Sequence, residues 1–179
     1  MIYLFLVIIM YCCFTGHRPE VLKIAFNENS PRFIALKRVI SDIIDQSISD
    51  GYTDFYCGMA RGIDMLCAQI VLEKAQENRA LHLHAVLPCQ NQSDGWREEE
   101  ITLYKDILSK CTPKTLISPF YTPECMLARN RFMVDNSGRI IAVWNGFYRG
   151  GTAYTVRYAK KQMKEIFLIR PSDLSVTEI

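Results

Sequence analysis

Apolar and polar residues alternate along this chain in two patterns, one typical of buried strands and one typical of helices. Short apolar runs bounded by glycine-containing turns, such as residues 11–15, predict buried strands. Between such runs apolar residues recur at helical spacing, as in residues 30–50, where Gly51 marks the end of the helix. The same criteria predict the remaining elements in this order: strand 53–57, helix 62–78, strand 81–87, helix 96–110, strand 115–118, helix 123–137, strand 139–144, helix 152–163 and strand 165–169.

This regular alternation of strands and helices predicts an α/β fold, with a Rossmann-like, doubly wound and mostly parallel sheet. No internal repeat, low-complexity tract or linker interrupts the pattern, so residues 1–179 are expected to form a single domain. With 49% hydrophobic residues, the chain can cover both faces of such a sheet.

Three glycine-containing loops each follow a predicted strand: residues 13–19 (Cys-Phe-Thr-Gly-His-Arg-Pro), 57–64 (Cys-Gly-Met-Ala-Arg-Gly-Ile-Asp) and 145–152 (Asn-Gly-Phe-Tyr-Arg-Gly-Gly-Thr). The carboxyl ends of parallel strands lie at one edge of a sheet, so these loops are expected to converge on one crevice. Glycines allow close backbone approach, and the free amides of a helix start attract anions. The loops therefore predict a phosphate site, although each alone is equally consistent with a tight turn.

Two charged residues stand where the second loop enters its helix. Arg61 faces the positive end of the helix dipole, which costs roughly 0.3–1 kcal/mol unless an anion lies beside it. We expect that anion to be a ligand; the alternatives are that Arg61 reaches solvent or pairs with Asp64. Asp64 either lines the site or accepts free amides in the first helical turn.

A fourth loop, residues 88–97, follows another strand and is expected to border the same crevice. Trp96 is suited to stack on a base and Gln92 to bond the edge of that base. Alternatively, Trp96 anchors the following helix in the core.

The net charge of +2 does not indicate a nucleic-acid or membrane partner. The seven cysteines form no C-x-x-C pair, which favours reduced thiols and a cytoplasmic protein. Cys12 and Cys13 are expected on opposite faces of a strand, and His82 and His84 lack a third ligand nearby, so we expect no metal site.

Residues 1–10 are strongly apolar but are too few to span a bilayer. They also lack the basic start and the small-residue cleavage site of a signal peptide. We expect them either to extend the first core strand or to precede the true start, in which case Met10 is the initiator.

Taken together, the three glycine loops and the segment Gly-Gly-Thr-Ala-Tyr-Thr-Val-Arg-Tyr-Ala make the chain resemble the YpsA-like family of the SLOG superfamily from residue 12 to residue 171. This resemblance implies a Rossmann-like fold related to the DNA-uptake protein DprA and to the LOG nucleotide phosphoribohydrolases. It also implies a homodimer, though weakly.

The LOG enzymes carry an M-x-x-R-K-x-x-M segment, and residues 126–133 keep its methionines and its arginine. The resemblance therefore implies that Arg129 faces the ligand, whereas Arg131 points elsewhere on its helix. The LOG glutamate that takes part in N-glycosidic cleavage corresponds to Thr155 in this chain. A hydroxyl stabilises positive charge poorly, so hydrolysis requires another acid, such as Asp64, to reach the site.

DprA carries a segment similar to residues 58–64, and its fold supports binding of single-stranded DNA. Such binding needs a basic groove with stacking aromatic residues. The candidates for that groove are Arg18, Arg61, Arg129, Arg131, Tyr148 and Arg149.

The first hypothesis is a nucleotide or nucleotide-derivative binding protein that acts as a sensor or adaptor; the others are a nucleotide N-glycosidic hydrolase and a single-stranded DNA binding protein. A phosphorylated, nucleotide-like small molecule is the expected ligand, and no further cofactor is indicated. The candidate ligand-binding residues are Thr15, Gly16, His17, Arg18, Gly58, Met59, Ala60, Arg61, Gly62, Asp64, Gln92, Trp96, Arg129, Asn145, Gly150, Gly151 and Thr152.

Overall fold

A computed structural model describes residues 10–24 and 26–179 of the chain. The expectation for the residues ahead of Met10 therefore lies outside the described residues. One seven-stranded sheet forms the centre, in the order β4-β3-β2-β1-β5-β6-β7, and all neighbouring strands are parallel except β6 and β7. The strands are β1 (Met10–Gly16), β2 (Tyr52–Cys57), β3 (His82–Leu87), β4 (Lys114–Leu116), β5 (Arg139–Val143), β6 (Glu165–Ile169) and β7 (Val176–Glu178).

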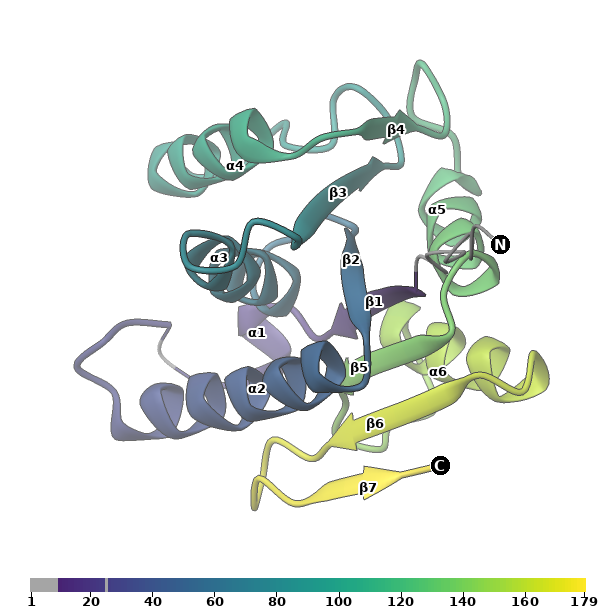
Figure 1. The fold of residues 1–179 in the computed structure, drawn as a ribbon. Coiled ribbons are helices and arrows are strands. Elements are labelled where there is room, and N and C mark those ends of the chain that lie inside the picture. Colours follow the sequence, from purple (N-terminus) through teal and green to yellow (C-terminus); the bar gives the residue numbers. More distant parts are fainter. Residues whose placement is uncertain (1–9, 25) are drawn as a thin grey trace, which may run out of the picture.

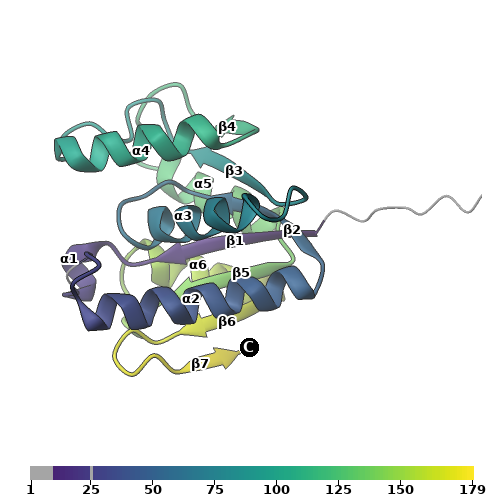
Figure 2. The ribbon, with the colours of Figure 1, turned by 60° about the vertical axis from the view of Figure 1, so that its left-hand side comes forward.

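Helices cover both faces of this sheet, with α2, α3 and α4 on one side and α5 and α6 on the other (Figures 1 and 2). The helices are α1 (Pro19–Leu22), α2 (Pro31–Ser49), α3 (Ile63–Ala75), α4 (Glu98–Lys110), α5 (Cys125–Asp135) and α6 (Gly151–Lys161). The arrangement is a Rossmann-like, doubly wound α/β fold and confirms the predicted fold class.

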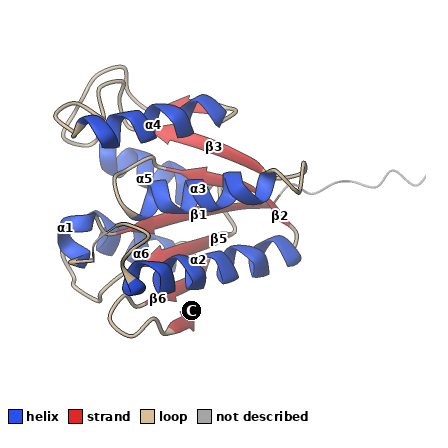
Figure 3. Ribbon diagram, turned by 90° about the vertical axis from the view of Figure 1, so that its left-hand side faces the viewer, coloured by secondary structure: helices blue, strands red, loops and turns tan. Residues whose placement is uncertain are grey.

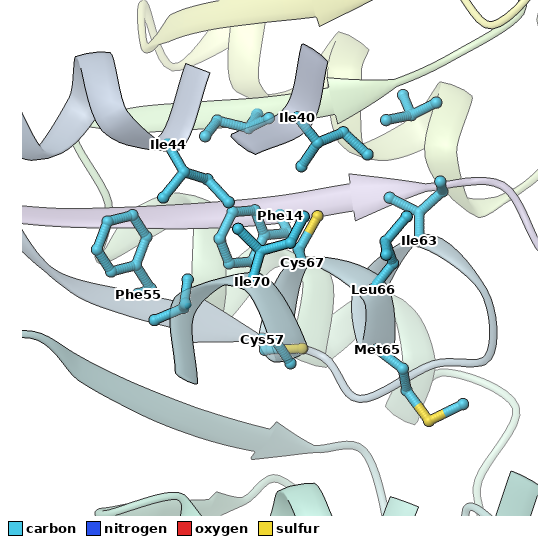
Figure 4. Close-up of a cluster of buried hydrophobic side chains, with 14 of the residues drawn as sticks. Phe14, Ile40, Ile44, Phe55, Cys57, Ile63, Met65, Leu66, Cys67 and Ile70 are labelled. Atoms are coloured by element: carbon cyan, nitrogen blue, oxygen red, sulfur yellow. The ribbon is translucent and has the colours of Figure 1, made fainter. Parts of the chain in front are cut away.

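The core is divided into two layers because successive strand residues point to opposite faces. Cys12 and Phe14 of β1 pack beneath α2 and α3, whereas Cys13 between them packs beneath α5 and α6. Figure 4 shows the first layer, in which Phe14 lies beside Phe55 of β2 with ring centroids 5.8 Å apart. The expectation that Cys12 and Cys13 face opposite sides is therefore confirmed.

A buried arginine closes the sheet at the amino end of β5. Arg139 contacts the carboxylates of Glu165 at 2.6 Å and Asp50 at 2.8 Å, and it donates to Ser47 Oγ at 3.0 Å. Its guanidinium also lies 4.5 Å from the ring centroid of Tyr52. This network joins α2, β2, β5 and β6 at the end of the sheet away from the glycine loops.

Two short elements were not predicted. Helix α1 is a single turn, too short to show helical periodicity, and it ends at Lys23, whose φ is 53°. Strand β7 has only three residues, all exposed, and it pairs antiparallel to β6 after a turn held by Asp173. None of the helices in residues 10–24 and 26–179 has the length and apolar character that crossing a membrane requires.

Candidate functional site

A cavity of about 330 Å³ opens beside the carboxyl ends of β1 and β5. These strands are neighbours because the chain moves outward from β1 to β4 and then returns on the other side of β1 at β5. Such a reversal leaves a crevice in which ligands of doubly wound folds bind. Figure 3 shows, in tan, the loops that connect the strands to the helices. Each of the three glycine loops contributes to the lining, through Thr15, Gly16, His17, Arg18, Ala60, Asp64, Gly150, Gly151 and Thr152.

The start of α6 is the part of the lining best suited to an anion. Gly150, the residue before the helix, has φ 96° and ψ 173°, a conformation that favours glycine, and no side chain caps the helix. The first intrahelical amide bond runs from Tyr154 N to Gly150 O, so the amides of Gly151 and Thr152 have no partner among the described residues. No acidic residue lies in the first turn. The positive end of this helix therefore faces the cavity without a neutralising group.

The glycine loops are named here by the strand that each follows: the β1 loop (residues 13–19), the β2 loop (57–64) and the β5 loop (145–152). The β1 loop packs against the start of α3. A Cβ atom at Gly16 would overlap the side chain of Ile63, so only glycine allows this contact. His17 follows, and its Nε2 lies within hydrogen-bond distance of two Asn145 atoms in the β5 loop, Oδ1 at 2.8 Å and the backbone nitrogen at 3.3 Å. Burial lowers the pKa of His17, and the bond to Asn145 partly opposes that shift. His17 therefore connects the β1 and β5 loops.

The β2 loop is held by two side chains from elsewhere in the chain. Gln92 donates through Nε2 to the carbonyls of Gly58 at 3.0 Å and Met59 at 2.9 Å. Arg129 of α5 also donates to Gly58 O. A Cβ atom at Gly58 would overlap the Arg129 guanidinium, which explains the glycine. Gly58, Met59 and Gln92 lie behind the cavity and, contrary to the prediction, are not part of its lining.

Arg129 and Asp64 form the buried charged pair of the cavity, and each is only 5% exposed. Arg129 Nη1 lies 3.8 Å from Asp64 Oδ2, and Arg129 Nε donates to Asn130 Oδ1 at 2.8 Å. Asp64 Oδ2 also accepts from the amide of Ala60 at 3.3 Å. Burial raises the pKa of Asp64, whereas Arg129, the Ala60 amide and Arg18 act in the opposite direction.

A chain of buried hydrogen bonds links Arg129 to the start of α6. Asn130 Nδ2 donates to Thr155 Oγ1 at 2.9 Å, and Thr155 Oγ1 donates to Gly151 O at 2.8 Å. Because Arg129 also donates to Gly58 O, these hydrogen bonds connect the β2 loop with the start of α6. Thr155 is fully buried and does not line the cavity.

The structure does not bring Arg61 to the cavity. Its guanidinium contacts Glu20 at 2.6 Å and Glu100 at 3.1 Å, and it lies 5.9 Å from the Trp96 ring centroid. The anion that the sequence requires beside Arg61 is thus provided by two carboxylates of the protein. Those partners were not foreseen because they lie about 40 residues away on either side in the sequence.

Three further candidates also lie outside the lining. Trp96 packs edge-on against Tyr104 of α4 at 5.4 Å, which corresponds to the alternative of a core anchor. Gly62 has φ 87° and approaches Pro19 closely, so it shapes the chain before α3. Asn145 Oδ1 contacts His17 Nε2 and accepts a hydrogen bond from the backbone amide of Phe147, so Asn145 holds the loop in shape.

Some lining residues were missed among the candidates. Asn130 adjoins Arg129 in the sequence, and Phe147 lies within the third glycine loop, so their places in the sequence could have indicated that both line the cavity. Val21 belongs to α1, an element that periodicity does not reveal. Arg149, predicted only as a DNA contact, also lines the cavity.

Within the described lining, Arg18, Arg129 and Arg149 are cationic and Asp64 is the one acidic residue. The fold and this site together define a Rossmann-like α/β protein with an anion-attracting cavity at the reversal point of its sheet. Residues 12–174 match the profile of the YpsA family, described as the YspA SLOG family, and the chain belongs to this family.

Similar proteins include the UPF0398 proteins of Bacillus thuringiensis strain Al Hakam and of Bacillus cereus strains AH187 and Q1. Each is 27% identical over 150 residues, which cover 83% of this chain and 81% of the relative. The predicted membership of the YpsA-like family is therefore confirmed.

Proposed function

We propose that the protein binds a nucleotide or a nucleotide derivative through its phosphate and acts as a sensor or adaptor. The observation that carries this proposal is the uncapped start of α6 within the cavity. Gly151 and Thr152, whose amides are free, line this cavity together with Arg18 and Arg149. Phosphate matches this combination of oriented amides and arginines.

The size and rim of the cavity support a nucleotide over a bare phosphate ion. Its volume of about 330 Å³ is at the small end of the range for small-molecule sites. Phe147 at the rim is 70% exposed, and its ring offers a surface on which a base can stack. In this proposal the phosphate lies at the start of α6 and the base lies against Phe147.

The absence of a carboxylate at position 155 supports binding over catalysis. Thr155 is 0% exposed and its hydroxyl is used in the chain between Asn130 and Gly151. Hydrolysis of an N-glycosidic bond is the second candidate, because Asp64 does place a carboxylate in the lining. That carboxylate lies beside Arg129, however, which reduces the stabilisation it can give to a developing positive charge.

Two observations favour a small ligand over a DNA strand. Arg61 is neutralised by Glu20 and Glu100, and Arg129 is too deeply buried to meet a polymer backbone. Of the remaining candidate cations, Arg18 and Arg149 line the cavity, and Arg131 donates to the hydroxyl of Tyr154 at 3.1 Å.

Thermal unfolding in the presence of mono-, di- and cyclic nucleotides tests the proposal. A ligand at one hundred times its Kd stabilises the folded state by about 2.7 kcal/mol, which raises Tm by about 5–10 °C for a chain of this size. If no nucleotide in the panel raises Tm, the proposal is refuted.

A matched pair of variants locates the binding. Gly151→Pro removes one free amide at the first helical position, where proline is tolerated, whereas Gly151→Ala keeps it. An added Cβ at Gly151 meets only Asn130 Nδ2, at 3.8 Å. We expect the proline variant to lose about tenfold or more in affinity and the alanine variant to bind like the unchanged protein. Equal binding by both variants would exclude α6 as the phosphate site.

Chromatographic detection of a released base tests the hydrolase alternative. Release that is abolished by Asp64→Asn would favour it. Binding without release, over a range of nucleotides, would leave the sensor or adaptor role.

A further inference from the structure

Asp64 is a buried acid with an unused acceptor. Its Oδ2 accepts from Ala60 N and lies near Arg129, but Oδ1 receives no hydrogen bond from any described residue. The side chain is only 5% exposed, and Asp64 lines the cavity. Because Asp64 lines the cavity, a ligand that supplies a donor to Oδ1 forms a hydrogen bond to a charged group, which is stronger than a bond between neutral groups.

The neighbours of Asp64 indicate which kind of donor fits. Arg129 already provides positive charge at 3.8 Å, and Arg18 also acts electrostatically on the Asp64 carboxylate. A second cation, such as a ligand ammonium group, would be repelled by this pair of arginines. A neutral hydroxyl can donate to Oδ1 without this repulsion.

The position of Asp64 separates this donor from the phosphate. Gly16 is packed against Ile63, the residue before Asp64, so Asp64 belongs to the wall made by the β1 loop and α3. The free amides at Gly151 belong to α6, which covers the other face of the sheet. A ligand that contacts both walls carries a phosphate at one end and a hydroxyl some bonds away, as a ribose phosphate does.

We infer that Asp64 accepts a hydrogen bond from a ribose hydroxyl, so that the site selects ribonucleotides over deoxyribonucleotides. This inference rests on the proposed function, since it assigns the sugar of a ligand whose phosphate lies at α6. It names Asp64 as the residue that determines sugar specificity.

Calorimetric titration with matched probes tests the inference. The probes are inorganic phosphate, ribose 5-phosphate, 2-deoxyribose 5-phosphate, adenosine monophosphate and its 2′-deoxy and 3′-deoxy forms. A hydrogen bond to a charged group corresponds to about a 10- to 100-fold difference in affinity. We therefore expect at least one deoxy nucleotide to bind that much more weakly than adenosine monophosphate.

Variants of Asp64 then assign the difference. Asp64→Ala removes the acceptor and is expected to bring the ratio of ribo to deoxy affinity close to one, whereas Asp64→Asn keeps the shape and lowers the ratio in part. Glu73→Gln removes one negative charge from the exposed side of the same helix and is expected to leave the ratio unchanged. Each ratio is measured within one protein, so a general loss of stability does not mimic the effect.

The outcomes are distinguishable from failure of the proposed function. Equal affinity for ribo and both deoxy probes overturns the inference while nucleotide binding stands. A ratio that survives in Asp64→Ala also overturns it, because another group then recognises the hydroxyl. If none of the phosphate compounds binds, the inference and the proposed function fall together.

Discussion

The buried chain from Asn130 through Thr155 to Gly151 makes a quantitative prediction about stability. Thr155→Val replaces the hydroxyl by a methyl group of nearly the same size at a position that is fully buried. The substitution leaves Asn130 Nδ2 without its acceptor and removes the side-chain donor to Gly151 O. Loss of a buried hydrogen-bond partner costs about 1–3 kcal/mol. With a urea m value of about 2 kcal/mol/M, a cost of 2 kcal/mol lowers the unfolding midpoint by about 1 M.

A double-mutant cycle shows whether the two residues act together. Asn130→Ala removes the same bond from the other side, so the double variant should cost less than the two single costs added. For residues in one network we expect a coupling of about 0.5–3 kcal/mol, measured by urea unfolding followed by circular dichroism. Thr102→Val is the matched control, because Thr102 makes the same bond to the carbonyl four residues earlier but lies exposed on α4. Single costs that add to within about 0.3 kcal/mol would refute the proposed link between α5 and α6.

Three further predictions follow from the contacts. Arg139→Met should destabilise the protein by about 2–4 kcal/mol in urea unfolding, because two carboxylates lose a buried partner. Arg170→Met, in an exposed ion pair, should hardly change the unfolding midpoint, and equal effects of the two substitutions would contradict this prediction. Gly58→Ala should cost about 1–3 kcal/mol and weaken nucleotide binding because its Cβ displaces Arg129, and unchanged melting and binding would refute that reasoning. Burial raises the pKa of Asp64, so the folded state keeps this proton at a higher pH than the unfolded state does, and stability falls as the pH rises from the ordinary aspartate pKa through the raised one. In urea unfolding measured from acidic to neutral pH, Asp64→Asn should lack this decline. A parallel decline in both proteins would show that Asp64 does not cause it.

Local patterns were enough to predict the sheet and its principal helices. The glycine loops also indicated which strand ends carry the site, since parallel strands bring their carboxyl ends together. Thr15, Asp64 and Gly151 were predicted in this way, and all three line the cavity. Local patterns did not reveal the partners of Arg61, because Glu20 and Glu100 come close only after α1 and α4 have packed. Arg61 does have anions beside it, but a favourable position for negative charge is the same whether a ligand or a carboxylate of the protein supplies that charge.

Arg129 is a second residue whose protein contacts could not be predicted from local patterns. The resemblance assigns it to the ligand, and it does line the cavity, yet its described hydrogen bonds run to Gly58 O and Asn130 Oδ1. A ligand bound in the cavity as proposed would therefore face an arginine whose position is already fixed by the protein, and it would not need to order a mobile side chain on binding. Because a fixed charge loses little conformational entropy when the ligand arrives, Arg129 can contribute at long range while the amides of Gly151 and Thr152 make the directional bonds. The buried network around Arg129 is thus the reason that the two walls of the cavity are expected to respond to a ligand as one unit.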